Sequence, residues 1–173
     1  GSFDWSKIRK LKKYYPQYGY FSFNLKLRKE VFRNLGACLS PYHAYLQSIG
    51  LETLALRFEK AASNSYAIAE FLSRQSKISS VNYPGLEGSK FYDISLKQFK
   101  KYPCSMVTFN FHSKEKCFNF LNKLQLIRRA TNISDNKTLI LHPATTIFCE
   151  YSAEKREELG VSDTLIRLTT GIE

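Results

Sequence analysis

The sequence predicts an α+β fold, an α/β sandwich in which helices pack on one face of a small sheet. Three observations lead to this prediction. The 173-residue chain is 43% hydrophobic and 14% aromatic, which is enough to build one core. Apolar residues in the first half of the chain repeat at helical spacing. In the second half they alternate over several short stretches, as in half-buried strands.

The amino-terminal segment, residues 1–36, predicts a connector rather than an independent fold. It has no clear hydrophobic period, and Pro16 and Gly19 interrupt any long helix. A helical pattern appears only near its end, where Gly36 is a typical C-terminal stop. We expect an irregular connector that ends in one short helix.

Residues 37–76 predict two linking helices. Ser40 followed by Pro41 is typical of an N-cap and a first helical position, where the missing N–H group of proline costs nothing. A second, longer helix follows, with an apolar stripe from Leu54 to Leu72 at helical spacing. We expect this stripe to pack across a sheet or a neighbouring subunit.

Residues 77–173 predict an α+β domain of short strands and helices. Residues 106–111 alternate between apolar and polar side chains, as expected of a strand. Ser152 and Gly160 are a typical N-cap and stop for a short helix. The expected strands are residues 80–83, 106–111, 126–127, 138–141 and 164–169, and the expected helices are residues 94–102, 114–124 and 152–159.

The net charge of +11 raises the question of nucleic-acid binding. Residues 1–36 carry +7 of this charge together with several aromatic side chains. Such a mixture can bind single-stranded nucleic acid, because the basic side chains contact phosphates and the aromatic rings stack on bases. No RNA- or DNA-binding signature accompanies the mixture, so nucleic acid is a disfavoured partner. A small basic nucleic-acid-binding domain stays open as an alternative.

The chain has no apolar run long enough to span a bilayer, and its first residues lack the apolar stretch of a secretory signal. We therefore expect a soluble, cytoplasmic protein without membrane contact. The four cysteines have neither metal-binding nor disulfide spacing, and the three histidines are isolated. We expect no metal site and no catalytic triad.

Arg167 is the candidate ligand-binding residue that the pattern singles out. It lies between Ile166 and Leu168 in the last expected strand, and alternation places it on the opposite face from both. A guanidinium presented by a strand can bind a carboxylate through two parallel hydrogen bonds. A surface arginine on the solvent face of an edge strand stays open as the alternative. Asn132, in a polar loop, has an amide suited to the same ligand, although such loops are often simple turns.

Five segments, in this order, resemble the pyridoxal-phosphate enzymes of cysteine and methionine metabolism. They are residues 34–46 (NLGACLSPYHAYL), 50–57 (GLETLALR), 81–86 (VNYPGL), 137–144 (KTLILHPA) and 165–173 (LIRLTTGIE). The run GACLSP, the opening Phe3-Asp4-Trp5 and Asn132 are more similar to the O-acetylhomoserine sulfhydrylase branch than to cystathionine synthases or lyases. The resemblance covers the chain from Phe3 onward, and residues 7–33 match loosely.

The resemblance implies both fold and chemistry. It implies the carboxyl-terminal domain of a fold-type I transferase, with a small, mostly antiparallel sheet preceded by long helices. It implies pyridoxal 5'-phosphate as cofactor of the parent enzyme, and O-acetylhomoserine with sulfide or a thiol as substrates of a γ-replacement. Arg167 matches the arginine that holds the substrate α-carboxylate in the family, and Asn132 matches the neighbouring carboxylate-binding position. A homo-oligomer, usually a tetramer, is implied as well.

The family carries its cofactor on a lysine of the larger, amino-terminal domain. The resemblance therefore implies that this chain alone binds no cofactor, contains no catalytic residue and is inactive without the missing domain as its partner. A truncated, non-catalytic interaction module is the alternative. Two departures from the family, Ile147-Phe148 where Thr-His is common and Ser134 where glycine is usual, imply altered substrate contacts or relaxed selection.

Overall fold

The structure is a computed structural model that describes residues 4–101 and 103–173. The chain forms two compact units, Gly1–Ile49 and Gly50–Glu173, whereas the sequence pattern places its boundaries after residues 36 and 76. No helix in the described ranges is both long and apolar enough to cross a membrane.

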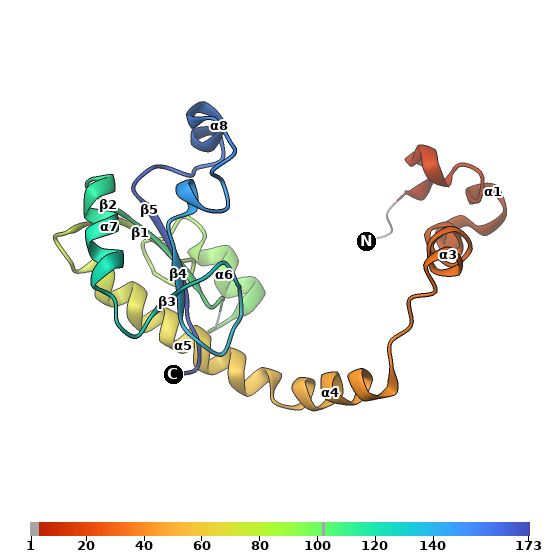
Figure 1. Cartoon of the computed structure of the whole chain (residues 1–173), viewed down its shortest axis with the longest axis horizontal. Coiled ribbons are helices and arrows are strands. Elements are labelled where there is room, and N and C mark those ends of the chain that lie inside the picture. The colour runs from red at the N-terminus through yellow and green to blue at the C-terminus, as the bar shows by residue number, and fades with distance from the viewer. Residues whose placement is uncertain (1–3, 102) are drawn as a thin grey trace. The chain divides into compact units, whose positions relative to one another are not determined.

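Residues 5–35 of the first unit form short helical turns, drawn in red and orange in Figure 1. Tyr14 is buried, and its hydroxyl donates to Glu30 Oε1 at 2.7 Å. Gly36 ends the last turn with a φ of 62°, which confirms the predicted stop. Helical turns fill most of the described part of residues 1–36, although the sequence there shows no clear hydrophobic period. The turns are η1 (Trp5–Lys7), η2 (Arg9–Leu11), α1 (Tyr15–Tyr18), η3 (Gly19–Phe21), α2 (Ser22–Lys26), η4 (Leu27–Phe32, a π-helix) and α3 (Arg33–Leu35).

The two linking helices are α4 (Pro41–Glu52) and α5 (Leu54–Ser73). Ser40 caps α4 as predicted, because its Oγ accepts from the N–H of His43 at 3.2 Å. The apolar stripe predicted for α5 is only partly buried, since Leu54 remains 49% exposed. The residues of α5 that pack inward are mostly small ones: Ala61, Ala62, Ser65, Ala69 and Leu72.

The second unit is built on one five-stranded sheet with the order β1-β2-β5-β4-β3. Neighbouring strands are antiparallel except β3 and β4, which confirms the expected, mostly antiparallel α+β arrangement. The expected strand at residues 126–127 is wrong, because Leu126 is 91% exposed and the strand begins two residues later. The strands are β1 (Ile78–Asn82), β2 (Met106–Phe111), β3 (Arg128–Arg129), β4 (Leu139–Leu141) and β5 (Leu165–Thr169).

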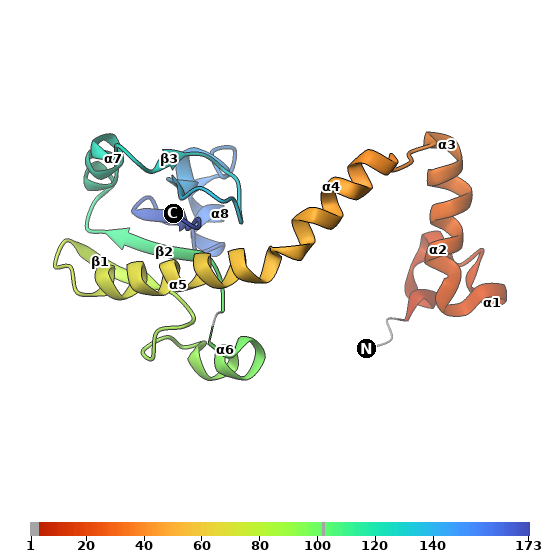
Figure 2. The same ribbon diagram turned by 90° about the horizontal axis from the view of Figure 1, so that it is seen from below.

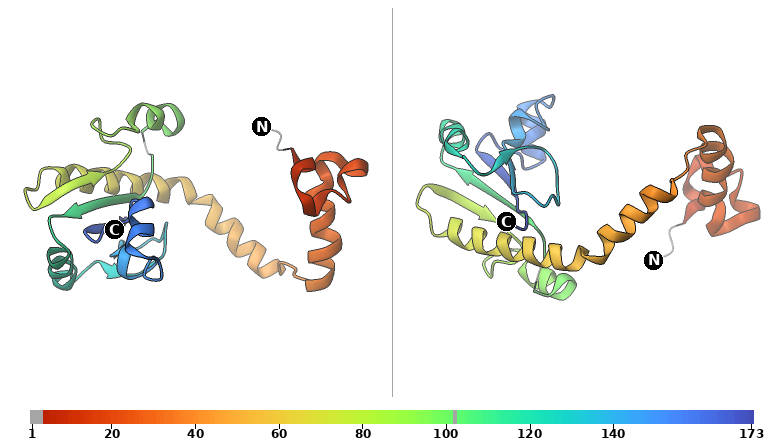
Figure 3. Two further views of the ribbon diagram at one scale, coloured as in Figure 1. Left: turned by 90° about the horizontal axis from the view of Figure 1, so that it is seen from above. Right: turned by 60° about the horizontal axis from the view of Figure 1, so that its bottom comes forward.

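Helices α5 and α7 cover one face of this sheet. Figure 2 shows α5 running beside β1 and β2, and Figure 3 shows α8 on the other side of the sheet from α5. Ser152 caps α8 by accepting from the N–H of Lys155 at 3.3 Å, as predicted. The predicted helix at residues 94–102 begins earlier, at Tyr92, and its last residue, Tyr102, lies outside the described residues. The remaining helices are α6 (Tyr92–Phe99), α7 (Lys114–Lys123), η5 (Pro143–Thr145) and α8 (Ala153–Glu158).

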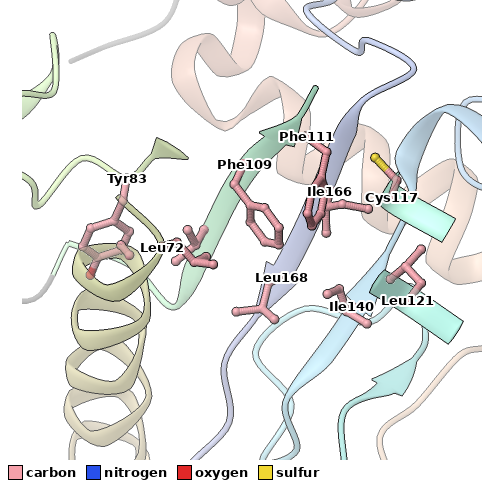
Figure 4. Packing of buried hydrophobic residues seen from close by; sticks show 11 residues of the cluster. Leu72, Tyr83, Phe109, Phe111, Cys117, Leu121, Ile140, Ile166 and Leu168 are labelled. Atoms are coloured by element: carbon pink, nitrogen blue, oxygen red, sulfur yellow. The ribbon is translucent and has the colours of Figure 1, made fainter. Parts of the chain in front are cut away.

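The hydrophobic core lies between the sheet and helices α5 and α7 (Figure 4). Phe109 is 1% exposed, and its ring contacts those of Phe111 and Phe120 edge-on, with centroids 5.8 and 6.1 Å apart. Such edge-to-face pairs are a favoured aromatic geometry. The alternation of β2 thus directs every second side chain into one core. The buried cluster is Ala69, Leu72, Tyr83, Val107, Phe109, Phe111, Cys117, Leu121, Ile140, Ile166 and Leu168.

Candidate functional site

Arg167 lies in the middle of β5, the central strand of the sheet. Its Cα pairs with those of Thr108 on β2 and Leu141 on β4. The flanking Ile166 and Leu168 belong to the core, whereas Arg167 is half-buried on the other face. The alternation in the sequence therefore predicts its orientation correctly. The edge-strand alternative is wrong, because β5 has a neighbour on each side.

Backbone carbonyl groups hold the guanidinium of Arg167 on one side. Nη2 donates to the carbonyl oxygen of Thr131 at 2.8 Å and approaches that of Asn132 at 3.5 Å, the outer limit of a hydrogen bond. Within residues 4–101 and 103–173, Nε and Nη1 have no hydrogen-bond acceptor, and no carboxylate forms an ion pair with Arg167. The guanidinium is thus anchored, yet several of its donors remain open to a ligand.

Partial burial withdraws water from the Arg167 guanidinium and lowers its pKa from the ordinary value. Because that ordinary value lies far above neutral, the side chain remains positively charged. A charge that is removed from water normally has a charged partner in the folded protein. The open donors can bind an anionic ligand, and the planar fork of arginine suits a carboxylate.

The structure brings Asn132 to Arg167 through its backbone, while its side-chain amide points elsewhere. Nδ2 donates to Asp135 Oδ2 at 2.9 Å, and Oδ1 accepts from the N–H of Ile133 at 3.0 Å. Both polar atoms of the amide are therefore engaged inside the loop. A direct contact between the Asn132 amide and a substrate stays a prediction.

The same loop contains one residue in the left-handed region. Ser134 has a φ of 59°, a conformation that glycine adopts freely and a side chain with a Cβ atom resists by about 1 kcal/mol. The left-handed backbone conformation explains why glycine is usual at this position in the family that the chain resembles. The serine keeps the backbone turn, at the cost of some strain.

Residues near the end of the chain hold this loop, although the sequence pattern did not single them out. Thr169 Oγ1 lies 3.5 Å from the carbonyl oxygen of Asn132, on the same strand as Arg167. Glu173 Oε1 accepts from the N–H of Thr138 at 2.8 Å, where the loop enters β4. The only local signal was a run of hydroxyl and glycine residues, Thr169–Gly171, after the strand. Such a run does not reveal a partner more than thirty positions away.

Ile147 and Phe148, the residues that replace Thr-His of the resembling family, lie in the turns after η5. Ile147 is 42% exposed. The Phe148 ring packs on that of Tyr151 at 5.7 Å, and its N–H donates to the carbonyl oxygen of Pro143 at 3.1 Å. Neither residue is hydrogen-bonded to Arg167, so the structure assigns them no direct part in anchoring the guanidinium.

The lysines provide no site for attaching a cofactor among the described residues. Each described lysine is exposed except Lys26, which is half-buried and hydrogen-bonded to Glu30. A lysine that reacts with a carbonyl compound is typically desolvated in a pocket or placed beside another cation. No described lysine is buried in this way.

The other candidate residues of the sequence are structural in the folded chain. His142 is buried, with Nδ1 2.9 Å from Thr145 Oγ1 and Nε2 2.9 Å from the carbonyl oxygen of Asp163. All cysteines are free thiols. Over the described ranges, no group of three or more His, Cys, Asp or Glu residues could hold a metal ion.

Comparison with known proteins gives the family of the chain. The family described as Cys/Met metabolism PLP-dependent enzyme matches residues 12–173. O-acetyl-L-homoserine sulfhydrylase 1 of Thermus thermophilus is 35% identical over 157 residues, which are 90% of this chain and 37% of that protein. L-methionine gamma-lyase of Fusobacterium nucleatum is 38% identical over 139 residues, which are 80% of this chain and 35% of that protein.

Two solved structures share the fold. The O-acetylhomoserine sulfhydrylase of Wolinella succinogenes aligns with a TM-score of 0.73 and 44% identity, over 99% of this chain and 46% of that one. A putative O-acetylhomoserine (thiol)-lyase from Campylobacter jejuni, solved with a pyridoxyl-lysine monophosphate residue, aligns with a TM-score of 0.80 and 35% identity over 87% of this chain and 36% of that one.

This chain spans less than half the length of each of these relatives. Their names indicate different reactions, because one is a sulfhydrylase and another is a γ-lyase, and both match most of this chain. What they share is the family and its cofactor. The match over residues 12–173, together with the common fold, shows that the chain belongs to the Cys/Met metabolism PLP-dependent enzyme family.

Proposed function

We propose that the protein carrying this chain is an O-acetylhomoserine sulfhydrylase that uses pyridoxal phosphate, and that this chain supplies the receptor for the substrate carboxylate. The relatives named O-acetylhomoserine sulfhydrylase support the substrate. One observation in the structure carries the proposal: Arg167 is partly desolvated, anchored by the Thr131 carbonyl, and without a carboxylate partner among the described residues.

In the proposed reaction, acetate leaves the γ carbon of O-acetylhomoserine, and sulfide or a thiol takes its place to give homocysteine or an analogue. When bound, the cofactor supplies the electron sink of such reactions. Arg167 binds the α-carboxylate through its open donors. Because it lies on a central strand, its position is fixed, and the bound substrate is therefore held in one orientation. Orientation of this kind is worth about 7 kcal/mol or more in favourable cases.

The proposal assigns the covalent chemistry to residues outside this chain. Its support is the exposure of the described lysines, all of which are exposed except Lys26, whose Nζ is hydrogen-bonded to Glu30. We therefore expect that the 173-residue chain, mixed with pyridoxal phosphate, O-acetyl-L-homoserine and sulfide, releases no homocysteine. Homocysteine release by the chain alone would contradict this part of the proposal.

Arg167→Ala and Arg167→Lys in the protein that carries this chain test the receptor. We expect the KM for O-acetyl-L-homoserine to rise about a hundredfold in the alanine variant, because a mispositioned substrate loses about that factor. The lysine variant keeps the charge but not the planar fork, so its KM also rises. The KM for sulfide and the absorption spectrum of the bound cofactor stay as in the unchanged protein.

Arg129→Lys is the matched control, because Arg129 is an exposed arginine of an edge strand whose Nη2 donates to Asn122 Oδ1 at 2.8 Å. It should leave both KM values unchanged. An unaltered KM for O-acetyl-L-homoserine in Arg167→Ala would remove Arg167 from the site. Release of methanethiol from L-methionine without homocysteine synthesis would instead assign the protein to the γ-lyases.

The proposal also includes a homo-oligomer, which the resemblance to the family implies. It includes a location in the cytoplasm, because the relatives are metabolic enzymes by name. Light scattering of the purified protein and fractionation of its cells test these two statements. A monomer would contradict the first, and recovery outside the cytoplasmic fraction would contradict the second.

A further inference from the structure

Glu173 makes a two-point contact with the segment that leads into β4. Oε1 accepts from the backbone N–H of Thr138 at 2.8 Å, and Oε2 accepts from Lys137 Nζ at 3.1 Å. Thr138 itself is buried. One exposed carboxylate therefore satisfies a backbone donor at the point where the loop, residues 131–137, joins the sheet.

The two residues before Glu173 hold the same part of the loop. The N–H of Gly171 donates to Thr138 Oγ1 at 3.1 Å, and that of Ile172 donates to the carbonyl oxygen of Asn136 at 3.1 Å. From α5, Asn64 Nδ2 donates to the carbonyl oxygens of Gly171 and Glu173 at 2.9 and 3.1 Å. The tail, residues 171–173, is thus fixed between α5 and the loop.

The opposite end of the loop carries the carbonyl groups that hold Arg167. Between the two ends, Asp135 links the loop to itself: Oδ1 accepts from the N–H of Lys137 and Oδ2 from Asn132 Nδ2, both at 2.9 Å. Hydrogen bonds therefore connect Glu173 through Lys137 and Asp135 to Asn132, whose carbonyl oxygen lies 3.5 Å from the guanidinium of Arg167.

We propose that Glu173 is a positioning residue: by fixing the end of the 131–137 loop at Thr138, it holds the Thr131 and Asn132 carbonyls where they orient Arg167 toward the substrate carboxylate. This inference rests on the proposed function of Arg167. Its physical basis is the flexibility of arginine, whose long side chain adopts many rotamers unless its donors are held. Only one bond of normal length, to Thr131, holds the guanidinium within the described residues.

The electrostatics of Glu173 agree with this role. The backbone N–H of Thr138, and then Lys137, lower the pKa of the Glu173 carboxyl, so the folded chain favours its charged form. The ion pair with Lys137 alone would contribute little, because water and salt screen exposed pairs of this kind. The bond to the backbone of Thr138 is the contact that positions the loop.

Three substitutions of Glu173 separate this bond from the charge. Glu173→Ala removes both contacts, and Glu173→Asp keeps the charge but withdraws the carboxylate from Thr138. Glu173→Gln keeps an oxygen that can accept from Thr138 while losing the charge. We expect the KM for O-acetyl-L-homoserine to rise about tenfold in the alanine and aspartate variants and to stay within a factor of about two in the glutamine variant, with kcat and the KM for sulfide little changed in all three.

A control and a second measurement complete the test. Glu158→Ala breaks an exposed pair with Lys155 on α8, at 2.6 Å, and should change nothing. In the 173-residue chain, nuclear magnetic resonance follows the Nε–H signal of Arg167, assigned by its loss in Arg167→Lys. We expect this signal to shift, and the amide of Thr138 to exchange faster with solvent, in Glu173→Ala and Glu173→Asp but not in Glu173→Gln.

The results distinguish this inference from the proposed function. A Glu173→Gln variant as impaired as Glu173→Ala would overturn the role of the Thr138 bond, and so would an unchanged Arg167 signal in Glu173→Asp. If the protein does not act on O-acetyl-L-homoserine, the proposed function fails, yet the resonance measurement still decides whether Glu173 positions Arg167.

Discussion

Ser65 Oγ and Thr170 Oγ1 lie 2.7 Å apart inside the second unit, although 105 residues separate them in the sequence. The two hydroxyl groups join α5 to the residue that follows β5. Thr170 Oγ1 also donates to the carbonyl oxygen of Ala61 at 2.7 Å and lies 3.4 Å from that of Ser105. This polar link anchors the end of the strand that carries Arg167 to the longest helix of the chain.

Thr170→Val removes this hydroxyl while keeping a similar volume. We expect the free energy of unfolding to fall by about 1–3 kcal/mol, because buried polar groups lose a partner. Urea denaturation at neutral pH measures the change. Ser65→Ala should cost less when added to Thr170→Val than alone, since both act on one contact. Ser63→Ala, an exposed serine of the same helix, is the control and should stay within about 0.5 kcal/mol; an equal effect there would refute the account.

The sequence predicts correctly those elements that depend only on residues close together in the chain. The Ser40-Pro41 start of α4, the alternation of β2 and the orientation of Arg167 follow from capping and from the period of a strand, and the structure confirms each. The Ser65 and Thr170 pair could not be predicted in this way. A hydroxyl in a helix and one after a strand give no local indication that they meet.

Two features that the sequence does not predict have the same physical origin. Leu126 and Ile127 are both apolar, and Ile127 is β-branched, which indicates a strand, but β4 pairs with the two residues that follow them. The side-chain amide of Asn132 is hydrogen-bonded to Asp135, three residues on, and it is the backbone carbonyl of Asn132 that approaches Arg167. Residues that are distant or that contact through the fold decide both the position of the strand and the hydrogen bonds of Asn132. The hydrophobic period of the sequence gives no information about such contacts.

Gly171→Ala tests how closely the tail approaches the loop. A Cβ atom at residue 171 would lie 2.3 Å from the carbonyl oxygen of Asn136, which is backbone and cannot rotate away. We expect a loss of about 1–3 kcal/mol in the free energy of unfolding, as for other overpacked sites. Gly88→Ala is the control, because its Cβ would meet nothing within 4 Å. Equal thermal midpoints for the two variants would contradict the close approach.

Asp135 should make the stability of the chain depend on acid. The backbone N–H of Lys137, and then the amide of Asn132, lower the pKa of Asp135 in the folded chain. A lowered folded pKa means that the charged carboxylate stabilises the fold above the unfolded pKa of about 3.9, and that this contribution disappears as the pH falls through the lower folded value.

Asp135→Asn therefore has a pH-dependent effect. We expect the variant to have a lower urea midpoint than the unchanged chain at pH 7, and the two midpoints to converge at an acid pH below the folded pKa of Asp135, where both side chains are neutral. Asp93→Asn, in the first turn of α6, controls for the loss of one surface charge. A difference of the same size at both pH values would show that the carboxylate charge is not responsible.

Tyr83→Phe tests a buried hydroxyl under the opposite condition, high pH. Tyr83 is 0% exposed, and its hydroxyl lies 3.2 Å from the carbonyl oxygen of Ala62 and 3.1 Å from that of Cys104. Burial is the main cause that raises the pKa of Tyr83, so the folded chain keeps this proton while the unfolded chain releases it at about pH 10.

At neutral pH the substitution should cost about 1 kcal/mol, because two carbonyl groups lose their donor. Above pH 10 the ionised tyrosine favours the unfolded state of the unchanged chain, whereas phenylalanine does not, so the cost should shrink. Urea midpoints at pH 8 and pH 11 measure this, with Tyr151→Phe, an exposed tyrosine, as the control. A cost that is constant between these two pH values would mean that Tyr83 ionises equally in the folded and unfolded chain.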